Sequence, residues 1–134
     1  MSLTEAKSPR FRQGDATRRA VLGDGHVDRA LEATTAFDEP FQTLITEAAW
    51  GNLWSRPEWS KRERSMVTIA LLAALGHYEE MAMHIRATAR TGATEADIRE
   101  ALLHVAIYAG VPTANSAIRI AKQVLAEMQG GAPQ

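Results

Sequence analysis

The stretch SKRERSMVTIALLAALGHYEEMAMHIRATARTG, residues 60–92, decides the fold because it reads as two successive helices. Ser60 and Glu63 have the spacing of a capping box, which opens the first helix, and Gly76 ends it. From Met66 to Leu75 this helix is apolar almost all the way round, a pattern typical of a helix buried on every side. In so small a chain, full burial needs a second subunit, and we therefore expect a homo-oligomer.

The second helix, residues 77–91, separates into three arcs on a wheel of about 100° per residue. The core stripe is apolar and consists of Tyr78, Met81, Ala82, Ile85 and Ala89. The opposite arc faces water and consists of Glu79, Arg86 and Arg90. A third arc mixes small and proton-active side chains, namely His77, Glu80, His84, Ala87, Thr88 and Thr91. Such a mixture on the flank of a helix indicates the wall of a pocket.

Glu80 and His84 are the candidate catalytic residues on this third arc. Their spacing of four places both side chains on one helical face, one turn apart. A carboxylate beside an imidazole orients the ring and raises its basicity, which makes a proton-transfer pair. The alternative is an ordinary exposed pair, worth a few tenths of a kcal/mol.

Before residue 60 the sequence predicts a polar arm and three helices. We expect residues 1–14 to form a flexible N-terminal arm, after which Asp15 opens a helix that Gly23 closes. Asp24 opens the next helix, with a buried side of Val27, Ala30 and Leu31. Asp38-Glu39-Pro40 opens a third, since a capping side chain precedes proline in the first turn. Its expected buried side is Phe41, Leu44, Ile45 and Ala48.

After residue 92 two more helices follow, which completes an all-α fold of six or seven helices. Thr94 to Asp97 repeats the capping signature, and Gly110-Val111-Pro112 breaks that helix and starts the last one. Nowhere do apolar and polar residues alternate as they would in a strand. We expect a single helical domain over residues 15–128, followed by a frayed tail at 129–134.

Several residues outside the Glu80 helix are candidates for binding a substrate. Trp50 and Trp54 share a helical face, and such pairs either anchor a core or interface or line a cavity. Glu47 lies close enough to point into the same space. Arg62 and Arg64 in a first helical turn suggest an anion site, against the alternative of two solvated arginines.

Composition excludes several classes of protein. The net charge of −1 gives no support to nucleic-acid binding. The chain has no cysteine, which excludes disulfides, thiol nucleophiles and cysteine-ligated zinc. We expect no signal peptide, no membrane span and a cytoplasmic location.

The chemistry that remains is acid–base catalysis without a cofactor. The chain lacks a glycine-rich phosphate loop, an HExxH motif and a serine nucleophile elbow. Its four histidines, His26, His77, His84 and His104, have none of the spacings of a helical ligand pair, so we expect no metal. His104 and Tyr108 form a second polar pair, which fits the edge of a core better than a catalytic role.

Four stretches resemble the carboxymuconolactone decarboxylase family within the alkylhydroperoxidase D-like superfamily. They are residues 21–57, with WGNLWSRP at their end, RERSMVTIALLAALG, EEMAMHIRA and IYAGVPTANSA. The likeness is collinear over roughly residues 10–126. In the redox branch of the superfamily a CxxC motif precedes the histidine that aligns with His84. Here His77 and Glu80 stand at the cysteine positions, so the resemblance favours the decarboxylase branch.

This resemblance implies an alkylhydroperoxidase D-like helical fold, a ring-like oligomer such as a trimer of dimers, and a step of protocatechuate breakdown by the β-ketoadipate route. The implied substrate is a lactone with two carboxylates, which calls for cationic recognition. Arg64 is the first choice, ahead of Arg56 and Arg86. His84 would donate the proton, oriented by Glu80. Trp54, Glu47, His26 and Tyr108 are further candidates for contacting the substrate.

Two alternatives stay open at this point. The first is an acid–base enzyme of the same fold that acts on a different lactone or β-keto acid. The second is a helical oligomer without catalytic activity, which serves as a binding or assembly module. In that case Glu80 and His84 are exposed surface residues with no catalytic role.

Overall fold

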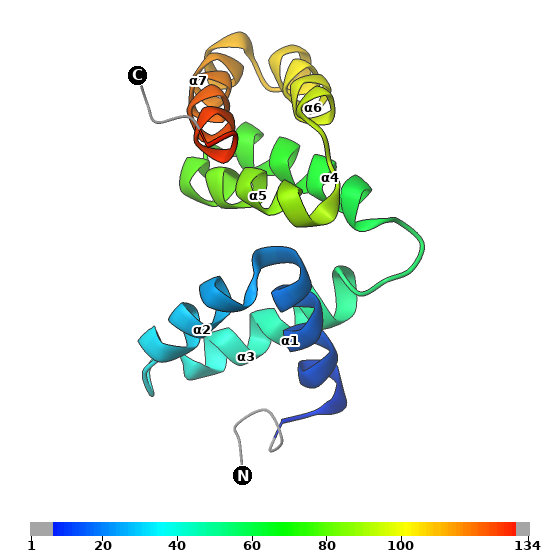
Figure 1. The fold of residues 1–134 in the computed structure, drawn as a ribbon, viewed down its shortest axis with the longest axis vertical. Helices are drawn as coiled ribbons and strands as arrows, with labels where there is room; N and C mark the ends of the chain where they lie inside the picture. The colour runs from blue at the N-terminus through cyan, green and yellow to red at the C-terminus, as the bar shows by residue number, and fades with distance from the viewer. Residues whose placement is uncertain (1–6, 131–134) are drawn as a thin grey trace. The chain divides into compact units, whose positions relative to one another are not determined.

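The computed structural model describes residues 7–130, and every regular element within them is a helix, which confirms the all-α prediction. The chain divides after Trp59 into two compact units, described separately below (Figure 1). The first holds α1 (Pro9–Leu22), α2 (Asp24–Ala33), α3 (Glu39–Ile45) and the π-helix η1 (Thr46–Leu53). The second holds α4 (Lys61–Ala74), α5 (Tyr78–Thr91), α6 (Glu95–Tyr108) and α7 (Val111–Met128). The single domain over residues 15–128 stays a prediction.

The first helix begins earlier than expected. α1 starts at Pro9, so residues 9–14, which we assigned to a flexible arm, are helical. Ser8 Oγ accepts a hydrogen bond from the Phe11 amide at 3.0 Å, and Pro9 occupies the first turn, where its missing N–H costs nothing. Ser8-Pro9 is therefore the start signal, and the choice of Asp15 was wrong. Residues 1–6 of the expected arm and 131–134 of the expected tail lie outside the described residues.

The close approach of α1 to η1 organises the first unit. A Cβ on Gly14 would collide with the Thr46 carbonyl, and one on Gly51 would lie 2.5 Å from the Arg10 carbonyl. We expected an ordinary α-helix through Trp54, but the Trp54 amide bonds the Ala49 carbonyl, five residues back, at 2.8 Å. This wider turn is a π-helix, a rare form that is frequent at functional sites.

The predicted buried sides of α2 and α3 are only partly correct. Val27 is fully buried, whereas Leu31, Phe41, Leu44 and Ala48 are exposed. Ala30 and Ile45 are half-buried. Periodicity tells which side chains share a helical face but not what covers that face, so these exposed positions are where the prediction was wrong.

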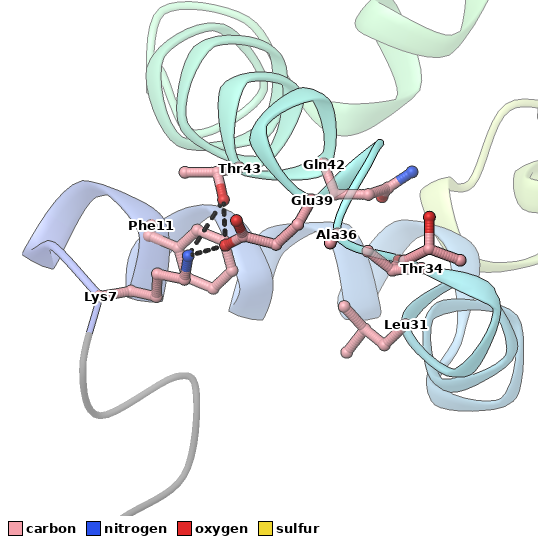
Figure 2. A pocket seen from close by; sticks show the side chains of 9 residues that line it. Lys7, Phe11, Leu31, Thr34, Ala36, Glu39, Gln42 and Thr43 are labelled. Carbon is pink, nitrogen blue, oxygen red and sulfur yellow. Dashed lines mark hydrogen bonds and ion pairs between the residues drawn. The ribbon is translucent and has the colours of Figure 1, made fainter.

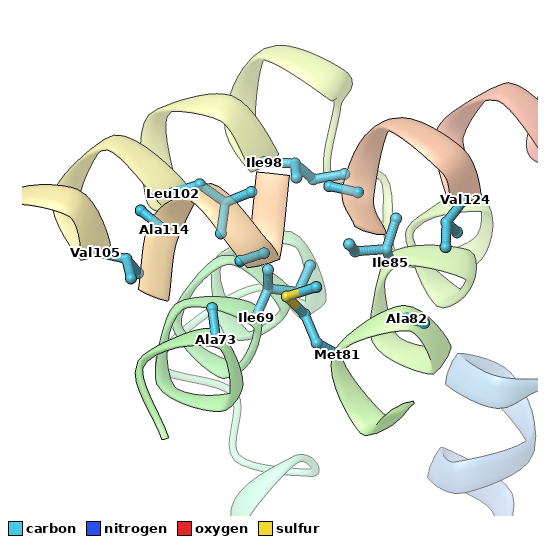
Figure 3. Close-up of a cluster of buried hydrophobic side chains, with 12 residues drawn as sticks. Ile69, Ala73, Met81, Ala82, Ile85, Ile98, Leu102, Val105, Ala114 and Val124 are labelled. Atoms are coloured by element: carbon cyan, nitrogen blue, oxygen red, sulfur yellow. The ribbon is translucent and has the colours of Figure 1, made fainter. Parts of the chain in front are cut away.

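The second unit is built from two helical hairpins around one apolar core (Figure 3). Side chains from all four helices form this core, namely Ile69, Ala73, Met81, Ala82, Ile85, Ile98, Leu102, Val105, Ala114, Ala117, Ala121 and Val124. Both predicted capping boxes are present, at Ser60 with Glu63 and at Thr94 with Asp97. As predicted, α7 begins directly after Gly110.

α4 departs from the expectation of burial on every side. Ile69 and Ala73 are fully buried, but Val67, Leu71 and Leu75 are exposed along one side of the helix in this chain. Among the described residues, no helix is long and apolar enough to cross a membrane.

Candidate active site

His84 lies in the middle of α5 and is shielded from solvent. Its side chain is 7% exposed, whereas Glu80, one turn earlier, is exposed. The imidazole and the carboxylate of the predicted pair therefore lie in different environments. The burial of His84 agrees with a position in a site that is shielded from water. The catalytic role of Glu80 stays a prediction.

The three arcs predicted for α5 are mostly correct. Met81, Ala82 and Ile85 are buried and Tyr78 is half-buried, but Ala89 is exposed, contrary to the prediction. The water-facing arc of Glu79, Arg86 and Arg90 is exposed as expected. On the third arc Ala87 and Thr88 are buried together with His84. The buried surface of α5 therefore extends beyond its apolar stripe onto the His84 flank.

A hydrogen bond between two hydroxyl groups shows which way that flank faces. Ser65 Oγ on α4 donates to Thr91 Oγ1 on α5 at 2.7 Å. Thr91 lies two turns after His84 on the same arc, so the His84 side of α5 turns toward α4. Because a helix rises about 1.5 Å per residue, His84 and the Ser65–Thr91 bond are about 10 Å apart along the axis.

Arg64 stands next to Ser65 on α4 and is 9% exposed. The α4–α5 hairpin thus carries a buried histidine on one helix and a buried arginine on the other. An arginine guanidinium matches a carboxylate in shape and charge, and binding of a substrate carboxylate by Arg64 stays a prediction.

Arg62 takes no part in the predicted anion site. Its guanidinium donates two hydrogen bonds of 2.7 Å to the Asp97 carboxylate at the start of α6. The pair raises the pKa of Arg62 and lowers the pKa of Asp97 to about 2, in both cases mainly through the hydrogen bonds between them. The idea of a double-arginine anion site was therefore wrong, because Arg62 is already paired with Asp97.

In the first unit, Glu47 and Trp54 both lie on or next to η1. Glu47 Oε2 accepts a hydrogen bond of 2.6 Å from Ser8 Oγ, which is the N-cap of α1. Trp54 is buried, and its ring lies 5.2 Å from that of Trp50, centroid to centroid. Ser55 Oγ donates to the Trp50 carbonyl at 2.7 Å, which supports the turn after the π-helix. Substrate contact by Glu47 or Trp54 stays a prediction.

His26 is half-buried and Arg18 is buried in the same unit. Burial lowers the pKa of His26, and nearby Arg18 and Arg29 lower it further. Burial likewise lowers the pKa of Arg18, whose Nη1 donates to Gln42 Oε1 at 3.2 Å. The sequence analysis overlooked Arg18, since nothing in its helix pattern separates a buried arginine from an exposed one.

The remaining candidates, Tyr108, Arg86 and Arg56, are exposed at the surface of their units. Tyr108 is 86% exposed, and its ring stacks on that of His104 with 6.3 Å between centroids. Arg86 pairs with Glu127 at 3.6 Å on the water-facing arc of α5, which makes it a poor candidate for a buried site. Arg56, in the first unit, lies 3.8 Å from Glu58. Arg64 differs from Arg56 and Arg86 in being buried, and its contact with a substrate stays a prediction.

Sequence reasoning overlooked the Ser65–Thr91 hydroxyl pair, although a signal was present. Ser65 is fully buried at the edge of an apolar run, and Thr91 closes the arc that carries His84. Buried hydroxyl groups are normally hydrogen-bonded, so a partner on the neighbouring helix was to be expected. Within residues 7–130, no three histidine or acidic side chains come together as a metal site would require.

A pocket of about 340 Å³ opens in the first unit (Figure 2). Phe11, Leu31 and Ala36 form its apolar walls. Lys7 Nζ lies 2.6 Å from Glu39 Oε1 and 3.1 Å from Thr43 Oγ1, so its cationic group is already paired. The pocket contains none of the predicted site residues.

Comparison with known proteins assigns this sequence to a family. The model of the carboxymuconolactone decarboxylase family matches residues 39–123, which span more than half of the chain. The chain belongs to the carboxymuconolactone decarboxylase family. The matched range includes η1 and the whole α4–α5 hairpin with Arg64 and His84. This confirms the family resemblance found in the sequence and, with it, the helical fold that the family implies.

Individual relatives support the same assignment. The chain is 43% identical over 125 residues to the 4-carboxymuconolactone decarboxylase of Acinetobacter baylyi, covering 93% of this chain and 92% of that protein. It is 38% identical over 118 residues to the nitrosuccinic acid decarboxylase of Metarhizium robertsii, covering 88% and 82%. A 4-carboxymuconolactone decarboxylase of Pseudomonas putida is 51% identical over 43 residues, 32% of this chain and 90% of that sequence.

Proposed function

We propose that this protein decarboxylates 4-carboxymuconolactone to the enol-lactone of 3-oxoadipate, as a step of protocatechuate breakdown by the β-ketoadipate route. The observation that carries the proposal is the similarity to the A. baylyi decarboxylase along nearly the full length of both chains. A buried histidine and a buried arginine on one helical hairpin support it independently, because the reaction needs a proton donor and an anion site.

The reaction supplies its own electron sink. When the carboxylate on the saturated ring carbon leaves as CO2, its electron pair passes through the ring double bond onto the lactone carbonyl oxygen. The product of that step is a conjugated 2-oxyfuran dienolate, and one proton delivered to the carbon next to the carbonyl gives the enol-lactone. Because the substrate itself delocalises the charge, the step needs no pyridoxal, thiamine or metal ion.

His84 and Arg64 divide this work between them in our proposal. Protonated His84 donates the proton to carbon, a contribution of typically about 10²–10⁴-fold to the rate. Arg64 binds a carboxylate of the substrate through the planar fork of donors on its guanidinium. Glu80, on the exposed side of the helix, orients the imidazole of His84.

The candidates of the first unit, Trp54, Glu47 and His26, and Tyr108 on α6 are secondary contacts in this proposal. Trp54 offers a buried aromatic wall and an indole N–H, which suits an oxyanion that develops on the substrate. His26 is half-buried, and its lowered pKa favours the neutral ring at physiological pH.

The same proposal includes assembly and location. The exposed Val67, Leu71 and Leu75 on α4 favour contact with further copies of the chain, as a ring-like trimer of dimers would provide. The absence of cysteine fits a reducing compartment, and we propose that the protein works in the cytoplasm.

A second candidate function follows from the M. robertsii relative, which is named for nitrosuccinic acid. Nitrosuccinic acid and 4-carboxymuconolactone share a carbon that bears a carboxylate, a CH2–carboxylate arm and an electron-accepting group. In the nitro compound the electron pair left by CO2 passes onto the nitro group as a nitronate, and one proton then completes the step. A site of one cation and one proton donor serves either compound.

Incubation of the purified protein with each compound separates the two candidates. We expect loss of the ultraviolet absorbance of the unsaturated lactone ring of 4-carboxymuconolactone and release of one CO2 per molecule. Turnover of nitrosuccinic acid alone would favour the second candidate. Turnover of neither compound would overturn both in favour of a non-catalytic role.

Site variants test the assigned roles. His84→Ala is expected to lower kcat by about 10²–10⁴-fold, and Arg64→Gln to raise KM more than it lowers kcat. Arg90→Gln, on the exposed arc of the same helix, is the control and should turn over as the unchanged protein does. A His84→Ala protein that decarboxylates at the normal rate would remove His84 from the mechanism.

A further inference from the structure

Arg18, on α1 of the first unit, is a buried cation without a paired anion among residues 7–130. It is 6% exposed and forms no ion pair in that part of the chain. Its Nη1 donates to the neutral amide oxygen of Gln42 at 3.2 Å, and its Nε is buried there without a hydrogen-bond partner. A guanidinium has five N–H donors, and a buried charge is normally paired. Arg18 therefore retains donors and a positive charge that no direct ion pair neutralises.

The acidic side chains at the α1–α2 junction pair with the next residue instead. Arg19, which is more exposed, lies 3.1 Å from Asp15, 3.2 Å from Asp24 and 2.8 Å from Asp28. Asp15 acts on Arg18 electrostatically, but its Oδ2 accepts its hydrogen bond from Arg19 Nε. The arginine nearer the surface thus has three carboxylate partners, and the buried arginine beside it has none within the described chain.

Further donors and positive charge lie near Arg18 on α2. Burial, and then the charges of Arg18 and Arg29, lower the pKa of the half-buried His26. A neutral imidazole still has one N–H to donate, and both arginines keep their charge at neutral pH. Two guanidinium groups and an imidazole donor are the kind of group that binds a carboxylate.

Gln42 connects Arg18 with the pocket of the first unit (Figure 2). The side chain whose amide oxygen accepts from Arg18 also lines this pocket. The volume of about 340 Å³ lies in the range of small-molecule sites, and Phe11, Leu31 and Ala36 supply apolar walls. A small molecule with a carboxylate and a short hydrocarbon body would match both the polar edge and the apolar walls.

We propose that Arg18 binds the carboxylate of a small molecule whose hydrocarbon part lies in this pocket, and that the Gln42 amide oxygen occupies the place of that carboxylate in the free protein. A carboxylate oxygen forms a shorter and stronger hydrogen bond with a guanidinium than a neutral amide oxygen does, so the exchange is favourable. This inference goes beyond the proposed function, because it concerns the first unit alone and does not depend on decarboxylation.

Calorimetric titration of the full chain with adipate, a six-carbon dicarboxylate, tests the proposal. Arg18→Gln should weaken the binding of adipate by about 10–100-fold, the usual effect of losing hydrogen bonds to a charged group. Arg90→Gln removes the same charge from an exposed position on α5 and should leave the affinity unchanged. 1,6-Hexanediol, which has the same chain length and no charge, should not bind. Equal affinity of Arg18→Gln and the unchanged protein for adipate, or no binding by the unchanged protein, would overturn the proposal.

A second variant supplies the missing carboxylate from within the chain. Gln42→Glu should pair with Arg18, raise the Tm and abolish the binding of adipate. Gln123→Glu, at an exposed position on α7, adds the same charge and should change neither quantity. A Gln42→Glu protein that binds adipate normally would also reject the site. Turnover of 4-carboxymuconolactone without binding of adipate would reject this site and keep the proposed function, and binding at Arg18 without turnover would do the opposite.

Discussion

Arg62 binds Asp97 through two parallel hydrogen bonds of 2.7 Å, which tie the first turn of α4 to the first turn of α6. Asp97 also closes the capping box of α6 by accepting from the Thr94 amide at 2.9 Å. One carboxylate therefore joins the first turn of α4 to the first turn of α6. Arg64, two residues further along α4, is buried, whereas Arg62 is exposed.

Acid should weaken the ion pair between Arg62 and Asp97. The pKa of Asp97 is about 2 in the folded chain, against an ordinary value of 3.8. The stability that the ionised carboxylate contributes is therefore fully present above about pH 3.8 and is lost as the pH falls through about 2. Asp97→Asn should flatten the loss of stability in this range, measured by denaturant unfolding at a series of pH values. Arg62→Gln should flatten it as well, and an unchanged acid slope in both variants would contradict the argument.

The Ser65–Thr91 bond should be energetically coupled. Ser65→Ala leaves the Thr91 hydroxyl group without its donor, and each single change should cost about 1 kcal/mol of unfolding free energy. The double variant Ser65→Ala/Thr91→Val should cost less than the sum of the two, by about 1 kcal/mol, in urea unfolding. Strict additivity would mean that the bond does not hold α4 against α5.

Gly14 and Gly51 should not tolerate alanine. In both cases the new Cβ would meet backbone atoms of the neighbouring helix, which cannot move aside as a side-chain end can. We expect each change to destabilise the chain by about 1–3 kcal/mol, measured as a lowered Tm. Gly25→Ala is the control, because its nearest contact is the flexible end of Arg29 at 3.3 Å. It should be neutral or stabilise α2 by up to about 1 kcal/mol.

Two variants decide whether Glu47 anchors α1 or contacts the substrate. Ser8→Ala removes the hydroxyl group that donates to Glu47 and caps α1, and it should lower the stability by about 1–2 kcal/mol with KM unchanged. Glu47→Gln keeps an oxygen acceptor for Ser8, so an anchoring role predicts a smaller loss of stability and an unchanged KM. A raised KM in Glu47→Gln, at normal stability, would instead assign Glu47 to the substrate.

Helix starts that depend on a few neighbouring residues were predictable. Ser60 with Glu63, Thr94 with Asp97, and Gly110 before Pro112 each determine a boundary through contacts within one turn. The one start placed wrongly, at Asp15, failed because Ser8-Pro9 carries an equally local signal that was overlooked. The wide turn of η1 was not predictable in this way, since its amides bond five residues back while the sequence still looks α-helical.

For the candidate site, the sequence by itself determined that His84 shares a flank of α5 with small and polar residues, because helical periodicity acts over neighbouring turns. Only the tertiary structure decided that this flank is buried, that Arg62 is paired and Arg64 buried, and that Phe41 and Leu44 face water. Those outcomes depend on contacts between residues far apart in the chain, such as 62 with 97 and 65 with 91. A local pattern carries no information about such contacts, since the free energy of burial depends on what lies across from a side chain in space.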